Sequence, residues 1–322
     1  MKKILAILFA VISFVGIAFA QRNIDMTGRF IPPSGRTLLF GGQNLADCEE
    51  FVQINNGRAP AGFMFYVALS DLKGLSEINN VGTGDMSGDE LLKRHPGAAL
   101  QIGLYLVGSL KEVVDGDLDG NIKDLGKWIK KSNVPVFLRI GYEFDLPDNN
   151  YDPDLYKKAF IRIVEKMDSL NVKNVAFVWH SYAASNPRGI QAWYPGDEYV
   201  DWCAISYFAG NDWIPMVKFA KAHSKPLMIA ESAPMTWYGV TDAKKPDWYR
   251  ILFKFIEEKD VQAFCYINCN WDAQPMFEQY HWGNSKLNFT EEITKIWLAN
   301  IANPRFIWLD NLYDYIKMPQ SK

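Results

Sequence analysis

Two glutamates, each following an apolar run, are the residues of this sequence best placed to carry out a reaction. Glu143 lies in the stretch PVFLRIGYEFD (135–145), and Glu231 lies in PLMIAESAP (226–234). Apolar runs of this kind predict buried strands, and barrel enzymes carry their catalytic groups where the strands end. One such glutamate would more simply be a solvated loop charge. Two of them, about 5–5.5 Å apart, would be the nucleophile and the proton donor of a retaining glycoside hydrolase.

The elements that must position this pair alternate between strands and helices. Apolar runs predict eight strands, at 37–40, 62–69, 99–107, 136–140, 175–179, 203–207, 227–230 and 261–267. Helical periodicity between them predicts helices at 45–54, 89–94, 119–131, 153–170, 212–223, 247–259 and 290–301. Buried strands that alternate with helices favour a parallel sheet, and eight such units favour a single closed (β/α)8 TIM barrel. An open doubly wound sheet is the alternative, but no glycine-rich phosphate loop follows an early strand.

Strand alternation predicts which side chains point into the barrel. It groups Glu143 with Arg139, and it groups His180 with Val178 and Ala176. By the same rule, Glu231 shares a face with residues 227 and 229, Tyr207 with 203 and 205, and Trp271 with 263, 265, 267 and 269. Small and apolar residues would then fill the barrel, with polar or aromatic residues at its rim.

Each rim residue has an expected role in binding sugar or in tuning a carboxylate. Tyr207 would donate a hydrogen bond to Glu231, and Trp271 would form a floor under the sugar. A buried Arg139 needs a partner, so it would pair with one of the two glutamates. His180 would bind sugar or the acid, and a purely structural histidine is equally compatible with the sequence. The neighbouring carboxylate should raise the pKa of Glu143.

Further expectations come from the first twenty residues and from composition. Lys2 and Lys3 precede the apolar run 4–19, and AFA (18–20) fits a cleavage site, which predicts a signal peptide over 1–20. The catalytic domain would then be 21–322, exported to the periplasm or the medium, with no membrane segment after cleavage. The net charge of −3 gives no basic surface for nucleic acid.

The cysteines and histidines bear on cross-links and cofactors. Export permits disulfides, and a Cys48–Cys269 bridge is conceivable, whereas Cys203 and Cys265 lie in apolar runs typical of buried thiols. The four histidines are scattered and no metal-ligand spacing occurs, so the sequence predicts neither a metal nor a cofactor.

The run WYPGDEYVDW (193–202), which leads into Tyr207, resembles the element before strand six in glycoside hydrolase family 26. That family belongs to clan A of the retaining β-glycosidases. The resemblance implies Glu143 as acid/base, Glu231 as nucleophile and Tyr207 as the group that orients the nucleophile. Tyr142 stands where family 26 mannanases usually carry His, so β-mannan, β-glucan and xylan are all open as substrates.

The partner expected from these patterns is a polysaccharide or an oligosaccharide. Tyr142, beside Glu143, and Trp193, in an aromatic polar loop, complete the expected sugar contacts. A non-catalytic glycan-binding protein on a hydrolase barrel is the first alternative, although it would be expected to have lost a glutamate. A metal-dependent barrel hydrolase is the second, but the strand ends do not offer a cluster of His and Asp ligands.

Overall fold

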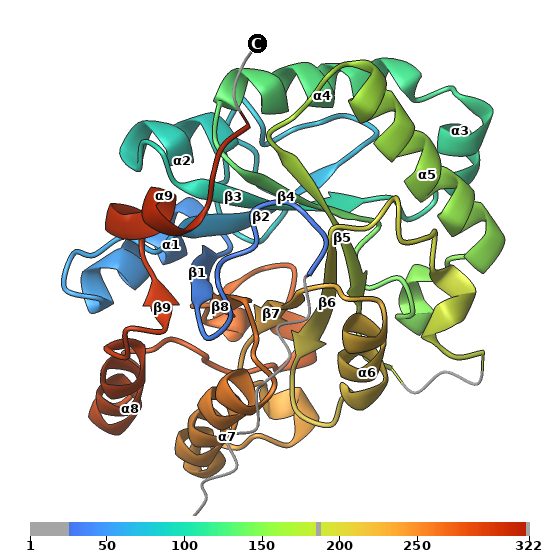
Figure 1. Ribbon diagram of the computed structural model, residues 1–322. Helices are drawn as coiled ribbons and strands as arrows, with labels where there is room; N and C mark the ends of the chain where they lie inside the picture. The colour runs from blue at the N-terminus through green and yellow to red at the C-terminus, as the bar shows by residue number, and fades with distance from the viewer. Residues whose placement is uncertain (1–25, 185–187, 320–322) are drawn as a thin grey trace, which may run out of the picture.

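A computed structural model describes residues 26–184 and 188–319 of the chain. Eight parallel strands close into a barrel because β1 pairs with both β2 and β8 (Figure 1). The strands are β1 (Thr37–Gly42), β2 (Gly62–Ala68), β3 (Ala99–Tyr105), β4 (Val136–Ile140), β5 (Val175–Ser181), β6 (Trp202–Tyr207), β7 (Leu227–Ser232) and β8 (Ala263–Ile267). The predicted (β/α)8 TIM barrel is confirmed.

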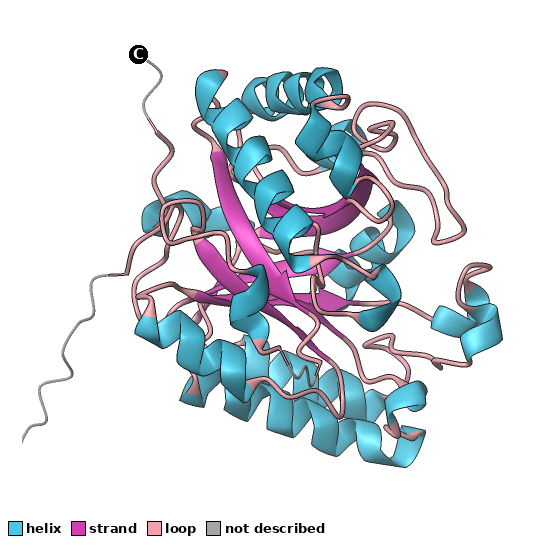
Figure 2. Ribbon diagram, turned by 90° about the vertical axis from the view of Figure 1, so that its right-hand side faces the viewer, coloured by secondary structure: helices cyan, strands magenta, loops and turns pink. Residues whose placement is uncertain are grey.

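Helices cover the outside of this barrel (Figures 1 and 2). They are α1 (Leu45–Ile54), α2 (Gly88–Arg94), α3 (Leu110–Asp115), α4 (Asp119–Ser132), α5 (Pro153–Ser169), α6 (Ile214–Ala222), α7 (Lys245–Glu258), α8 (Glu291–Ile301) and α9 (Leu312–Tyr315). The sequence prediction missed α3, α9 and β9 (Phe306–Ile307), a short strand that pairs with β1. Each is too short to show a periodic pattern.

Helix α5 begins where its sequence says it should. The side chain of Asp152 accepts hydrogen bonds from the backbone N–H groups of Asp154 (3.0 Å) and Leu155 (2.9 Å), and Pro153 occupies the first helical position. This cap satisfies donors that the helix itself cannot, and proline lacks the N–H that would otherwise be orphaned there. The cap fixes α5 directly after the loop that carries Glu143.

Two apolar layers hold the barrel together. The outer layer packs the strands against the helices, and the inner layer fills the barrel. At the amino end of the strands the ring of Phe137 makes edge-on contacts with Phe40 and Trp202, both at 5.4 Å between centroids, and with Phe30 at 5.8 Å. This end of the barrel is therefore a packed aromatic core rather than a pore.

The predicted alternation holds on three strands and fails on two. The inner layer contains Phe137 of β4, Ala176 and Val178 of β5, and Ala263, Cys265 and Ile267 of β8, as expected. On β6 and β7 the parity is the opposite, because residues 203, 205, 227 and 229 belong to the outer layer. Trp202, Ala204, Met228 and Ala230 point inward instead. Those parity predictions, on which the expected inward placement of Tyr207 and Glu231 depended, were wrong for residues 203, 205, 227 and 229.

Three other sequence predictions concern parts of the chain away from the barrel centre. Residues 1–20, the predicted signal peptide, lie outside the described residues. In the described ranges no helix has the length and apolar character needed to span a bilayer. All four cysteines are buried free thiols, so the conceivable Cys48–Cys269 bridge is not formed.

Candidate active site

Glu143 sits on a tightly held turn after β4. Gly141 and Glu143 both adopt positive φ angles, 53° and 54°. A side chain at Gly141 would also bring Cβ to 2.9 Å from the ring of Tyr156. The Glu143 carbonyl accepts from the Asn149 side chain (2.9 Å), and the next backbone N–H, of Phe144, donates to His180 O (3.1 Å). A strained backbone that is held this firmly is typical of functional sites.

Glu231 reaches the barrel centre through an irregularity in β7. The pairing of β6 with β7 shifts between Ile205 and Ser206, so that Ile205 pairs with Ile229 and Ser206 with Glu231. Ala230 is left without a partner on β6, and its carbonyl accepts a 2.7 Å hydrogen bond from the buried Gln101 side chain of β3. This shift turns Glu231 inward although Leu227 and Ile229 face outward. Sequence parity cannot foresee such a shift.

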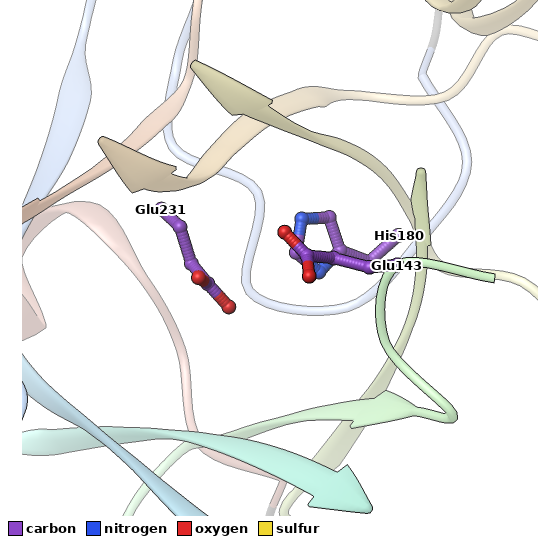
Figure 3. Close-up of side chains that lie close together, drawn as sticks. All are labelled: Glu143, His180 and Glu231. Carbon is purple, nitrogen blue, oxygen red and sulfur yellow. The ribbon is translucent and has the colours of Figure 1, made fainter. Parts of the chain in front are cut away.

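The two glutamates meet near the barrel axis. One side-chain atom from each of Glu143, Glu231 and His180 lies within 4.8 Å of the others. Glu231 points into the central space from one side, and Glu143 and His180 point into it from the other (Figure 3). A separation of this size matches the short carboxyl spacing of retaining glycoside hydrolases, and it is shorter than the roughly 6.5–9.5 Å of inverting ones.

Arg139 forms the buried ion pair that the sequence predicts. Its Nη1 donates to Glu231 Oε1, and the Arg139 side chain is fully buried. Its guanidinium lies 5.2 Å from the ring centroids of both Tyr66 and Tyr142. Gly103 on β3 leaves room for it, since a Cβ there would come within 2.8 Å of Nη2. The pair places an ionised carboxylate at Glu231 with a fixed positive charge beside it.

The aromatic contacts also account for unusual features of Arg139. Its Nε and Nη2 atoms are buried and have no hydrogen-bond partner among the described residues. The π faces of Tyr66 and Tyr142 stabilise the cation in place of hydrogen bonds. Arg139 is therefore held in place by rings as well as by the carboxylate.

His180 and Ser206 connect this ion pair to Glu143. His180 Nδ1 lies 3.2 Å from Arg139 Nη1, and its Nε2 lies 3.1 Å from Ser206 Oγ. Ser206 Oγ donates to Glu143 Oε1 at 2.5 Å. Ser206 was not predicted from the sequence, because strand alternation counted from Tyr207 assigned that neighbouring residue to the inner face. The signal available was a serine in the apolar run CAISY (203–207).

The two glutamates lie in electrostatically different surroundings. Burial and then the Glu231 charge raise the pKa of Glu143 from 4.5 to about 8, against the lowering effects of Ser206 and Arg139. The predicted direction is confirmed, with burial as the larger cause. Burial, followed by the charge of Arg139, holds the pKa of His180 well below its usual range. At neutral pH the site therefore holds a protonated Glu143 and a neutral His180 beside an ion-paired Glu231.

Glu143, His180 and Glu231 are also close enough together to be considered as a metal-binding group. Both ring nitrogens of His180 already have protein partners, Arg139 and Ser206. The guanidinium of Arg139 adds a fixed positive charge at the same place. Such surroundings favour a carboxylate pair over a cation site.

The remaining predicted residues differ in how close they come to the glutamates. Tyr142 lies in the site, stacked 6.5 Å from His180. Trp271 is in the inner layer but only 2 % exposed, with Nε1 donating to Ser285 Oγ at 3.0 Å. Trp193 is buried in the outer layer against Phe144 and is not brought to the glutamates.

Tyr207 requires a correction. The predicted hydrogen bond to Glu231 is absent from the described residues, because Tyr207 faces outward and stacks on Trp213 at 4.0 Å between centroids. The ring is also packed against Phe255 of α7, at 5.0 Å. The residue of β6 that turns inward at this level is Ser206, and Arg139 takes the place at Glu231 that was expected for Tyr207.

A parallel barrel that presents two glutamates at this spacing, one ion-paired and one with a raised pKa, is the arrangement of a retaining glycoside hydrolase. Comparison with known proteins agrees. The family model "Glycosyl hydrolase family 26" matches residues 106–233, a range that includes both glutamates. A β-1,3-xylanase from Vibrio sp is 30% identical over 339 residues, which cover 95% of this chain and 73% of the relative. A β-1,3-xylanase from Alcaligenes sp is also 30% identical, with 95% and 71% covered.

Solved structures support the same fold at lower identity. A family 26 β-mannanase from Bacteroides ovatus superposes with a TM-score of 0.63 at 12% identity, covering 89% of this chain and 94% of that one. A modular endo-β-1,4-mannanase from Cellulomonas fimi gives 0.63 at 15% identity, with 89% and 76% covered. The chain belongs to glycosyl hydrolase family 26 and is a retaining glycoside hydrolase.

Proposed function

We propose that this chain hydrolyses β-1,3-xylan by a double displacement in which Glu231 is the nucleophile and Glu143 the acid/base. The observation that carries the assignment of roles is the contrast between the two carboxyl groups. Glu231 is paired with Arg139, whereas the pKa of Glu143 is raised to about 8. An ionised carboxylate can attack the anomeric carbon, and a protonated one can supply a proton.

The first half of the reaction forms a covalent intermediate. Glu231 attacks the anomeric carbon, and the bond from that carbon to the glycosidic oxygen breaks. Glu143 gives its proton to the departing oxygen, so the leaving sugar departs as an alcohol. The enzyme is left with a glycosyl ester at Glu231 and a carboxylate at Glu143. Forming this ester removes the negative charge that helped to raise the pKa of Glu143, which suits Glu143 for its next role as a base.

The second half releases the sugar. Glu143 takes a proton from water, whose oxygen attacks the anomeric carbon and displaces Glu231 as a carboxylate. Two inversions give net retention of configuration, and Glu143 ends protonated as it began.

The choice of β-1,3-xylan comes from the two relatives at 30% identity, both β-1,3-xylanases. Their matches span 95% of this chain, whereas the mannanase structures are 12–15% identical. β-Mannan is the second candidate, because these structures share the barrel. Tyr142, which lies beside Arg139 and His180, is the residue we propose to contact the sugar together with Trp271.

Reducing-sugar release from β-1,3-xylan, β-1,4-xylan, β-mannan and β-glucan tests this proposal. We expect release from β-1,3-xylan by the wild type and its loss in Glu231→Gln. The exposed helix residue Glu112 provides a matched control, since Glu112→Gln should act like wild type. Release from β-mannan alone would make β-mannan, rather than β-1,3-xylan, the substrate. Release that survives Glu231→Gln would overturn the assignment of Glu231 as nucleophile. Binding without release would favour a glycan-binding protein.

We also propose that the protein is exported through residues 1–20. The support is the sequence itself: Lys2 and Lys3, an apolar run and AFA at 18–20. Mass spectrometry of the protein made in a secreting host should find an amino terminus at Gln21. An intact Met1 terminus on cell-retained protein would contradict export.

A further inference from the structure

A continuous chain of buried hydrogen bonds connects the two glutamates. It runs from Glu231 to Nη1 of Arg139, from the same Nη1 to His180 Nδ1 (3.2 Å), and from His180 Nε2 to Ser206 Oγ (3.1 Å). Its last step is from Ser206 Oγ to Glu143 Oε1 (2.5 Å). Arg139, His180 and Ser206 are each fully buried, so water does not compete for these bonds.

Arg139 sets the direction of the hydrogen bonds made by His180. A guanidinium can only donate, so His180 Nδ1 must be an acceptor without a proton. The ring is then neutral with its proton on Nε2, and the lowered pKa of His180 agrees with this state. Ser206 Oγ therefore accepts from His180, and the acceptor for its single hydroxyl proton is Glu143 Oε1.

We infer that Ser206, oriented by His180 and Arg139, is a positioning residue that holds Oε1 of Glu143 as an acceptor, so that the transferable proton is carried by Oε2. An oxygen that accepts a 2.5 Å bond from a hydroxyl whose only proton is already committed has no room for a proton of its own. The acid would thus present its proton from one defined oxygen. This inference rests on the proposed role of Glu143 as acid/base.

The same bond has a second consequence in the base half of the reaction. A hydrogen bond from a hydroxyl is stronger to a carboxylate than to a neutral acid, so Ser206 lowers the pKa of Glu143. It opposes the larger raising effects of burial and of Glu231. The other ionisable or charged groups around Glu143 come from β2, β4, β5, β7 and their loops: Tyr66, Arg139, Tyr142, Asp145, Tyr151, His180, Tyr182, Glu231 and Tyr238.

The Ser206→Ala variant tests the positioning role through two readouts. The basic limb of the kcat/KM–pH profile should move to higher pH, because a bond that lowers the pKa of Glu143 is gone. On aryl glycosides of the sugar that the wild type cleaves, kcat should fall about 10- to 100-fold for a poorly acidic leaving phenol. It should recover towards wild type for a dinitrophenol, which needs little help from an acid.

Matched variants separate positioning from a general loss of packing. Thr37 Oγ1 also donates from a buried hydroxyl, to Val261 O at 2.6 Å, but Thr37 begins β1 at the opposite end of the barrel. Thr37→Val should leave the pH limb in place. Ser206→Thr keeps the hydroxyl, so its limb should stay at the wild-type pH. If Ser206→Ala does not fold, the comparison of His180→Gln with His180→Leu replaces it.

The two His180 variants differ in whether the hydrogen bonds from Arg139 and to Ser206 can keep their directions. The glutamine oxygen can accept from Arg139 and its nitrogen can donate to Ser206, whereas leucine does neither. We expect His180→Leu to reproduce the shifted limb and His180→Gln to keep most of the wild-type profile. Equal losses for both leaving phenols with an unmoved limb would overturn the inference. A wild type that cleaves no glycan would instead overturn the proposed function.

Discussion

Strand β4 carries one residue from each of two contrasting regions of the barrel interior. Phe137 belongs to the aromatic core at the amino end of the strands, and Arg139, two residues on, belongs to the charged site at the carboxyl end. The first region packs aromatic rings against one another. The second buries an arginine, a histidine and two glutamates within the same barrel. The packed rings at the amino end of the strands supply stability. This stability lets the carboxyl end hold charges that are costly to bury.

The largest effect we expect is on activity, from Glu143→Gln. Glutamine keeps an oxygen for Ser206 but has no proton to give, so kcat on the polysaccharide should fall by about 10²- to 10⁴-fold. The basic limb of the pH profile, expected near the pKa of about 8, should disappear with it. Steady-state kinetics across pH 5–10 measure both. A variant that retains wild-type activity would remove Glu143 from the mechanism.

Arg139→Met should damage both activity and stability. The change leaves Glu231 buried without its counter-ion, and breaking a buried pair in this way costs about 3–5 kcal/mol. It also removes the group that orients the nucleophile, so kcat should fall by about 100-fold or more. In the double variant Arg139→Met/Glu231→Gln, Tm should recover but activity should not. A Tm that stays low would show that packing, rather than charge, holds Arg139 in place.

Phe137→Ala should affect stability alone. Removing this ring from its contacts with Phe30, Phe40 and Trp202 should lower the free energy of unfolding by about 3–5 kcal/mol. The glutamates lie at the other end of the barrel, so activity per folded molecule should stay within about twofold of wild type. Urea unfolding and kinetics at low temperature measure the two effects. A large loss of kcat in folded protein would contradict the division between the two regions.

The charged site at the carboxyl end of the strands should also make the free energy of unfolding depend on pH. Between pH 4.5 and about 8, native Glu143 keeps a proton that the unfolded chain has released, so the free energy of unfolding falls as pH rises through this window. Above about 8 this dependence ends, since both states are ionised. Relative to wild type, Glu143→Gln should gain at least about 2 °C in Tm between pH 5 and pH 8. Parallel melting curves for the two proteins would show that Glu143 is not protonated at neutral pH.

The contrast between the two regions also explains what could be predicted from the sequence. The barrel was readable because each strand is a continuous apolar run between helical patterns, and both glutamates were found because they follow such runs. The ion pair of Arg139 was predictable because a buried guanidinium needs a partner. The inward turn of Glu231 at the end of β7 was not compatible with simple alternation, since one unpaired residue, Ala230, reverses the alternation of β7 without any mark in the sequence. Ser206 was missed and Tyr207 misassigned for a different reason: β6 alternates regularly, but its apolar run does not show which alternate set faces inward.

Tyr207→Phe tests this last point and should have the smallest effect. The sequence alone places the Tyr207 hydroxyl on Glu231, which would make its loss costly to kcat. The structure instead stacks the ring on Trp213, and among the described residues the hydroxyl has no hydrogen-bond partner that links it to the site. We therefore expect kcat within about twofold of wild type and an unchanged pH profile. A loss of tenfold or more would mean that β6 turns Tyr207 inward, in place of Ser206.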